Sequence, residues 1–220
     1  MEKLARAALI ILIGFIPLSC SVPETPTNRG VYMLLDTSGT YTEELDKARQ
    51  IIAYLLTQME AGDAFAVARI DTGSFSEKDI VAKMIFSDIP SAANQEKRVF
   101  MEKIDEFIED TESAAYTDIS GGLLQAEEYL DEHEVGRKTI LIFSDMREEL
   151  PKGYNRDIDL SFNQVEVVAV NVTKLRTDNI DPREYLDRLS SWRQKVEAGG
   201  GQWRVVNDLD RLGKLLGEGG

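Results

Sequence analysis

The sequence predicts an α/β layered fold built around a mostly parallel sheet. Three continuous apolar runs, at 31–35 (VYMLL), 139–143 (TILIF) and 165–170 (VEVVAV), are typical of strands buried on both faces. Amphipathic segments alternate with these runs, which indicates repeated strand–helix–strand units. The chain has 220 residues, enough for one domain with a substantial core.

The strands are predicted from continuous apolar content or from alternation of small and apolar residues, as in DAFAVARID at 63–71. In chain order they are predicted over 31–35, 63–71, 79–87, 139–143, 165–170 and 203–206. The segment over 79–87 is the weakest of these, because its apolar residues are the least continuous.

Helices are predicted where apolar side chains recur three and four residues apart. They cover 45–59, 95–108, 119–131, 182–196 and 209–216. The first is marked by Leu45, Ala48, Ile52, Leu55 and Met59. Gly62 ends that first helix, as glycine commonly does. We expect Trp192 and Trp203, on either side of the last helix-to-strand passage, to lie in the core.

The first residues have the layout of a secretory signal. Lys3 and Arg6 precede an apolar stretch over 7–16, which is too short and wrongly flanked for a transmembrane helix. Cys20 sits where bacterial lipoproteins carry their lipidated residue, so the segment resembles a lipobox. That resemblance implies cleavage before Cys20 and a lipid anchor in the cell envelope, facing the periplasm or the exterior. Ser21 stands where an inner-membrane retention signal would have an aspartate, which favours the outer membrane.

The predicted organisation has four parts. They are a signal peptide over 1–19, a lipidated cysteine with a short tether over 20–30, a domain over 31–216 and a flexible tail over 217–220. Pro17 stands where the lipoprotein pattern prefers an aliphatic residue, so an ordinary signal peptide is the alternative for the first part.

Composition excludes several kinds of chemistry. The chain has 25 Lys and Arg against 39 Asp and Glu, a net charge of -14, which argues against nucleic acid as a partner. One cysteine cannot form a disulfide within the chain, and with one histidine no Cys/His zinc site can be built. The histidine, His133, lies among acidic neighbours and is expected at the surface without a catalytic role. Carboxylates and hydroxyls remain, and these are ligands for hard cations.

Two carboxylates and three hydroxyls are predicted to meet at one edge of the sheet. Asp36 follows the first strand directly and opens the segment DTSGT, which contains Ser38 and Thr40. Asp145 follows the strand TILIF, and Thr117 comes just before a helix. Because functional crevices of such sheets lie outside the carboxyl ends of the strands, these residues form a candidate site. An all-oxygen set with few charges suits Mg²⁺.

At this point the sequence resembles the von Willebrand factor type A domain with its metal-ion-dependent adhesion site. The family pattern is Asp-x-Ser-x-Ser after the first strand, a threonine in a later loop and an aspartate after the fourth strand. Asp36, Ser38 and Thr40 match the first part, Thr117 the second and Asp145 the third. The resemblance covers roughly residues 31–216.

The resemblance implies a Rossmann-like, doubly wound sheet with helices on both faces and one divalent cation, Mg²⁺ or Mn²⁺. Ser38, Thr40 and Thr117 would bind the ion directly, and Asp36 and Asp145 largely through water. The open position would accept a carboxylate from a protein partner. The chain would then be a binding module rather than an enzyme, with no small-molecule substrate.

Four residues beside these motifs are predicted to form the partner-binding rim: Tyr41, Asp118, Met146 and Glu148. They are chosen by their position in the sequence alone. Met146 replaces the glycine that commonly follows the last aspartate of the pattern, which affects the shape of that loop.

Two alternatives remain open. A haloacid-dehalogenase-type phosphatase also places an aspartate after its first strand and uses Mg²⁺, but it needs a second aspartate two residues later as general acid. Ser38 stands there and cannot supply a proton in that way. The other alternative is an envelope scaffold lipoprotein that does not use a metal.

Overall fold

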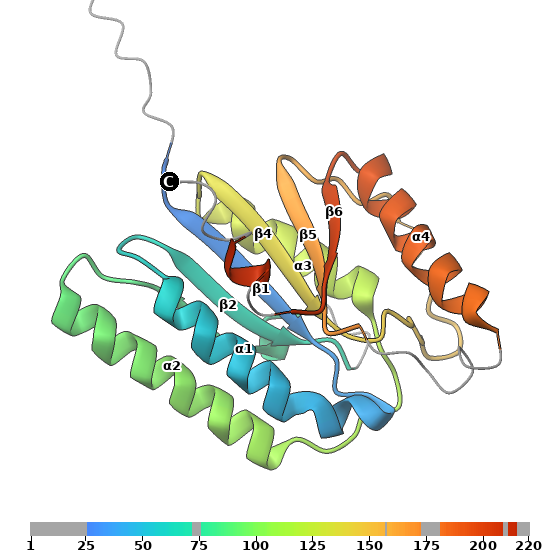
Figure 1. The fold of residues 1–220 in the computed structure, drawn as a ribbon, viewed down its shortest axis with the longest axis horizontal. Helices are drawn as coiled ribbons and strands as arrows, with labels where there is room; N and C mark the ends of the chain where they lie inside the picture. The colour runs from blue at the N-terminus through green and yellow to red at the C-terminus, as the bar shows by residue number, and fades with distance from the viewer. Residues whose placement is uncertain (1–25, 72–75, 157, 173–180, 209–210, 215–220) are drawn as a thin grey trace, which may run out of the picture.

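A six-stranded sheet runs through the centre of the molecule in the order β3-β2-β1-β4-β5-β6 (Figure 1). In this computed structural model the described residues are 26–71, 76–156, 158–172, 181–208 and 211–214, without the side chains of Thr40, Glu43 and Pro182. The strands are β1 (Arg29–Leu35), β2 (Ala64–Arg69), β3 (Ile80–Ile85), β4 (Arg137–Phe143), β5 (Val165–Val170) and β6 (Gln202–Val206). Every pairing is parallel except that of β2 with β3, so the predicted mostly parallel sheet is confirmed.

Four α-helices and two short 3-10 helices connect the strands in the part of the chain that the structure describes. They are η1 (Gly39–Glu44), α1 (Leu45–Gln58), η2 (Glu77–Asp79), α2 (Pro90–Asp110), α3 (Ile119–Glu132) and α4 (Pro182–Ala198). Helix α2 begins five residues before the predicted start, because Pro90 occupies its first turn and no large apolar residue marks that turn. The predicted helix over 209–216 is described only at 211–214, which are helical.

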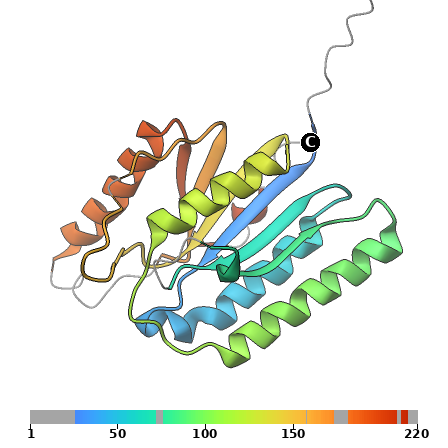
Figure 2. The same ribbon diagram turned by 180° about the vertical axis from the view of Figure 1, so that it is seen from behind.

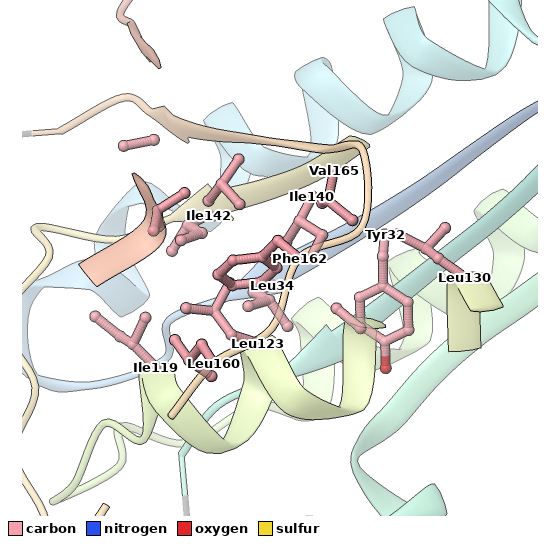
Figure 3. Packing of buried hydrophobic residues seen from close by; sticks show 14 of the residues in the cluster. Tyr32, Leu34, Ile119, Leu123, Leu130, Ile140, Ile142, Leu160, Phe162 and Val165 are labelled. Atoms are coloured by element: carbon pink, nitrogen blue, oxygen red, sulfur yellow. The ribbon is translucent and has the colours of Figure 1, made fainter. Parts of the chain in front are cut away.

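The helices cover both faces of the sheet, as predicted. Helices α1 and α2 lie on one face (Figure 1), and α3 and α4 lie on the other (Figure 2). Successive residues of β1 point to opposite faces: Met33 packs in the core cluster under α1 and α2, and Leu34 in the cluster under α3 and α4 (Figure 3). Trp192 and Trp203 are 7% and 8% exposed in the second cluster, which confirms the prediction for both.

Three further observations bear on the sequence predictions. Residues 1–25, which include Cys20 and most of the predicted tether, lie outside the described residues. Among the described residues no helix has the length and apolar character needed to cross a bilayer. His133 is partly buried rather than fully solvated, and its Nδ1 lies 2.7 Å from the carbonyl oxygen of Tyr129.

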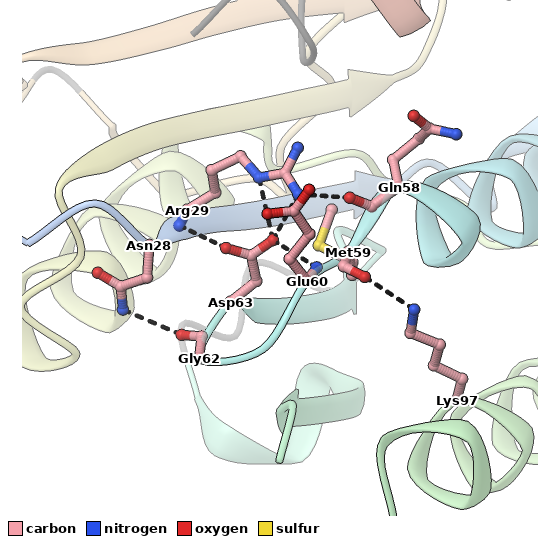
Figure 4. Close-up of polar contacts among 8 residues, drawn as sticks. All are labelled: Asn28, Arg29, Gln58, Met59, Glu60, Gly62, Asp63 and Lys97. Carbon is pink, nitrogen blue, oxygen red and sulfur yellow. Dashed lines mark hydrogen bonds and ion pairs between the residues drawn. The ribbon is translucent and has the colours of Figure 1, made fainter. Parts of the chain in front are cut away.

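Two charged side chains fix the start of β1 against the loop that precedes β2 (Figure 4). The Asp63 carboxylate accepts hydrogen bonds from the Arg29 backbone N–H at 2.7 Å and from its Nε and Nη2 at 3.0 and 2.7 Å. It also accepts one from the Glu60 N–H at 2.8 Å, and Arg29 donates to the carbonyl of Gln58. The Asp63 side chain is 3% exposed, so this ion pair lies almost entirely out of water.

Helix α3 approaches the sheet closely at Gly122. A Cβ atom at this position would lie 2.5 Å from Ile70 Cγ2 and 3.1 Å from both Cδ atoms of Leu34. We therefore expect Gly122→Ala to lower the free energy of unfolding by about 1–3 kcal/mol, although alanine is the better helix former. Thermal unfolding tests this, with Ser190→Ala at an exposed position of α4 as a control that should not lose stability.

Candidate metal site at the carboxyl edge of the sheet

The candidate site lies where the order of strands reverses. Strands β1 and β4 are neighbours, β2 and β3 extend the sheet on one side, and β5 and β6 extend it on the other. Leu35 pairs with Phe143, and the Asp36 N–H donates to the Phe143 carbonyl at 3.0 Å. The residues that follow β1 and β4 are therefore brought side by side at a topological switch point, a common place for a binding site.

Three hydroxyl groups converge on the carboxylate of Asp36, which is 1% exposed. Its Oδ1 accepts hydrogen bonds from Ser38 Oγ at 2.6 Å, from the Ser38 N–H at 2.9 Å and from Thr117 Oγ1 at 3.3 Å. Its Oδ2 accepts a hydrogen bond from Ser144 Oγ at 2.6 Å. The structure thus brings together Asp36, Ser38 and Thr117, three of the five predicted site residues.

Backbone hydrogen bonds hold the loop of Thr117 against its neighbours. Thr117 and Glu149 exchange N–H···O bonds of 2.8 and 2.9 Å, and the Asp118 N–H donates to the Ile70 carbonyl at 2.8 Å. The Ala114 N–H donates to the Thr37 carbonyl at 2.9 Å. Backbone hydrogen bonds therefore join loops that are far apart in the sequence around Asp36.

Asp145 lies near this group but faces a different partner. Its Oδ1 accepts a hydrogen bond from the Arg147 N–H at 2.8 Å, and its carbonyl accepts one from Arg188 Nε at 2.9 Å. No hydrogen bond joins its carboxylate to Asp36, Ser38 or Thr117. The side chain of Thr40, the fifth predicted residue, is outside the described part of η1.

Burial raises the pKa of both carboxyl groups above the ordinary range. For Asp36 the hydrogen bonds from Ser144, Ser38 and Thr117 oppose this effect of burial on the pKa. For Asp145 the Arg147 N–H opposes burial, and the negative charge of Asp36 raises the pKa further. The ionised forms of Asp36 and Asp145 repel each other in a poorly hydrated place. A bound cation would stabilise the ionised form of both.

The chemistry of the donor set fits a magnesium or manganese ion. The two aspartates and the hydroxyls offer oxygen ligands only, which suits Mg²⁺ and leaves no soft ligand for zinc. No group of three or more His, Cys, Asp and Glu side chains that could hold a metal occurs in the described ranges. A site here would therefore depend on neutral hydroxyls as well as on Asp36 and Asp145.

The sequence did not single out Ser144, although its hydroxyl contacts both sides of the site. Ser144 is fully buried, and it accepts a hydrogen bond from the Met146 N–H at 3.0 Å while it donates to Asp36. A serine one residue before an aspartate has no distinctive signature. Only the register of β4 against β1, which places it opposite Asp36, could have indicated it.

We expect Ser144→Ala to lower the free energy of unfolding by about 2–3 kcal/mol, since two buried hydrogen bonds are lost, the one accepted from the Met146 N–H and the one donated to Asp36. The pKa of Asp36 should rise further, because that hydrogen bond stabilises the ionised carboxylate. Chemical denaturation and NMR titration of the Asp36 carboxyl carbon measure the two effects. Ser91→Ala, an exposed serine of α2, is the control and should change neither quantity.

The predicted rim is corrected at Tyr41, Met146 and Asp118, because all three side chains are buried. Tyr41 is 2% exposed and its hydroxyl donates to the Asn171 carbonyl. Met146 is 1% exposed, and its carbonyl accepts a hydrogen bond from Trp192 Nε1 at 2.9 Å. Met146 also has a φ of 67°, a left-handed conformation that favours glycine, so its backbone keeps the shape that glycine would allow.

Asp118, the third buried candidate, and the partly buried Glu148 hold the start of α3. Asp118 is 3% exposed, accepts a hydrogen bond from the Gly121 N–H at 2.8 Å and pairs with Arg156 Nη2 at 2.8 Å. Glu148 is partly buried and accepts a hydrogen bond from the Ser120 N–H at 2.7 Å. These contacts satisfy backbone groups in the first turn of a helix, where carboxylates are favourable.

Comparison with known proteins supports the fold. No protein-family model and no curated protein matches the chain. A von Willebrand factor type A structure from Catenulispora acidiphila matches over 88% of this chain and 42% of that one, with 14% identity and a TM-score of 0.52. The chain has the von Willebrand factor type A fold.

Two further solved structures match the chain, one from a much longer protein and one from a protein of similar length. The pilus adhesin SpaC from Lactobacillus rhamnosus GG matches over 87% of this chain and 29% of that one, with 10% identity and a TM-score of 0.51. An aerotolerance-related membrane protein from Bacteroides fragilis matches over 87% and 98%, with 14% identity and a TM-score of 0.47. The chain thus spans less than half the length of the Catenulispora protein and less than a third of SpaC.

Proposed function

We propose that this chain is a binding module in which one Mg²⁺ or Mn²⁺ ion engages a carboxylate of a protein partner. Asp36, Ser38, Thr40, Thr117 and Asp145 would hold the ion. The observation that carries the proposal is the convergence of Ser38, Thr117 and Ser144 hydroxyls on the buried carboxylate of Asp36.

The charge of the chain bears on which partners the ion would select. A net charge of -14 repels a broadly acidic partner at long range, although salt screens this beyond about 8 Å. The ion would be a local positive point on a negative body, and neutral hydroxyl ligands would leave much of its charge uncompensated. A partner with one well-placed Asp or Glu side chain would therefore be favoured over a polyacidic one.

We also propose where in the cell the protein is located. A signal peptide over 1–19 and a lipid on Cys20 would anchor the module in the cell envelope, with the outer membrane favoured. Mass spectrometry of the chain expressed in bacteria should find a diacylglyceryl group on Cys20 and no residue before it. A chain that keeps residues 1–19, or carries an unmodified Cys20, would contradict the proposed lipid anchor. It would leave the proposal for the metal site unaffected.

The binding step is tested with acetate, the simplest carboxylate. We expect Mn²⁺ bound to the full chain to enhance the relaxation of ¹³C-labelled acetate, because the carboxylate enters the coordination sphere of the ion. Asp36→Asn should remove this enhancement, and Asp105→Asn, a change in an exposed ion pair with Arg49, should keep it. Enhancement equal to that of free Mn²⁺, or unchanged by Asp36→Asn, would contradict the proposal.

A further inference from the structure

Two isoleucine side chains are exposed at the edge of the sheet where the parallel strands begin, which we call the amino edge. Ile85 is 52% exposed at the end of β3, and Ile89 is 62% exposed directly before α2. Because β3 runs antiparallel to its neighbour, its last residue lies beside the first residues of β2 and β1. Ile85 pairs with Ala64, which pairs with Gly30. The candidate metal site lies at the opposite, carboxyl edge.

The local structure does not explain either exposed side chain. Ile89 occupies the N-cap position of α2, where Ser, Thr, Asn and Asp are preferred because their side chains can cap the helix. Ile85 points to the face of the sheet opposite Met84, and among the described residues neither isoleucine belongs to a core cluster. Three residues separate the two, so both lie on the turn between β3 and α2. Large apolar side chains gathered at an exposed place indicate a surface that is covered by something else.

The described chain starts at this same edge. The Gly136 N–H, just before β4, donates to the Asn28 carbonyl at 3.0 Å. Asn28 Nδ2 donates to the Gly62 carbonyl at 3.0 Å (Figure 4), and the Gly62 N–H donates to the Phe86 carbonyl at 2.8 Å. Hydrogen bonds therefore connect the start of the described chain to the turn that carries the two isoleucines.

The length of chain between Cys20 and this edge limits how far the edge can lie from a lipid on that cysteine. Six residues lead from Cys20 to Pro26. Six residues span at most about 20 Å. Ile85 lies two strands away from β1, which is about 10 Å at ordinary strand spacing. With Cys20 anchored, the turn between β3 and α2 is therefore within reach of the bilayer surface.

We propose that Ile85 and Ile89 contact the lipid bilayer and orient the anchored module with its amino edge against the membrane. Exposed apolar side chains of this kind enter the boundary between lipid headgroups and acyl chains. Strand β1 rises about 20 Å from the amino edge to the carboxyl edge. Asp36 and the candidate metal site would then face away from the membrane, towards a partner. The inference rests on the proposed lipid anchor and does not depend on a bound metal.

The test uses the full lipidated chain in phosphatidylcholine vesicles, with one cysteine introduced at a time. The lipid blocks the sulfur of Cys20, so the fluorophore NBD labels only the introduced cysteine. A nitroxide placed on the lipid near the headgroup quenches NBD that contacts the bilayer. We expect the label in Ile89→Cys to be quenched roughly three-fold more than the label in Leu186→Cys, because only the first enters the headgroup boundary.

Leu186 is the matched control because it is also 62% exposed but lies far from the amino edge. It belongs to the start of α4, at the far end of the molecule from the start of β1 (Figure 1). Arg188, two residues later, donates to the Asp145 carbonyl at the carboxyl edge. In the labelled Ile89→Cys chain, the further change Ile85→Ser should reduce the quenching without loss of thermal stability, because Ile85 is exposed.

Flotation of the vesicles tests the anchor separately. If the chain floats with the vesicles and the labels in Ile89→Cys and Leu186→Cys are quenched equally, the anchor stands and the proposed orientation is overturned. A chain that does not float contradicts the anchor and the orientation together. Self-quenching between labelled Ile89→Cys chains, without quenching by the lipid, would assign the two isoleucines to a contact with a second copy of the chain and would also overturn the proposal.

Discussion

Replacing Asp36 with asparagine is expected to remove the stabilisation of the chain by Mg²⁺ while leaving the metal-free chain at least as stable as the wild type. At a Mg²⁺ concentration of a hundred times its dissociation constant, binding would stabilise the wild type by about 2.7 kcal/mol. For a chain of this size that corresponds to a rise in Tm of about 5–10 °C. Thermal unfolding with Mg²⁺ and with EDTA measures both parts, and Asp105→Asn should behave as the wild type does.

The pH dependence of this difference has a definite sign. Burial raises the pKa of Asp36, so the folded chain holds the proton more tightly than the unfolded chain does. The ionised carboxylate therefore costs stability, and the cost appears as the pH rises from the unfolded pKa, near about 4, through the raised folded pKa. In EDTA the advantage of Asp36→Asn should shrink as the pH is lowered from 7. An advantage that grows towards low pH would contradict the burial of a charged Asp36.

Asp63→Ala is expected to lower the free energy of unfolding by about 3–5 kcal/mol. The change removes four hydrogen bonds to the Asp63 carboxylate, including both bonds of its ion pair with the Arg29 guanidinium, whose side chain is 16% exposed. Breaking a buried pair by removing one partner carries a cost of that size. Urea denaturation measures it.

The exposed pair of Arg49 with Asp105 is the matched control. Its side chains are 46% and 38% exposed, and Asp105→Ala should lower the free energy of unfolding by less than about 1 kcal/mol. Equal losses for Asp63→Ala and Asp105→Ala would show that burial does not set the strength of the Arg29–Asp63 pair.

The sheet could be predicted from the sequence because its central strands carry their own signal. The runs VYMLL, TILIF and VEVVAV are apolar at nearly every position, and each lies within a strand that is buried on both faces. Boundaries were less predictable where no apolar period marks them, as in the first turn of α2 at Pro90. The antiparallel direction of β3 follows from its short connection to β2, and the sequence pattern alone does not show it.

The site could be predicted only in part. Asp36, Ser38 and Thr117 meet because the ends of β1 and β4 and the start of α3 share one edge, which follows from the order of elements. The contact with Ser144 depends on strand register, which a single sequence does not reveal. The rim prediction is wrong at Tyr41, Met146 and Asp118, because a position beside a motif does not determine whether a side chain is buried. At Tyr41 the η1 turn directs the side chain inward.

Calorimetric titration of the full chain with Mg²⁺ tests the central claim most directly. We predict binding of one ion per chain by the wild type, no binding by Asp36→Asn and unchanged binding by Asp105→Asn. An absence of binding by the wild type, or equal binding by the wild type and Asp36→Asn, would contradict the metal site.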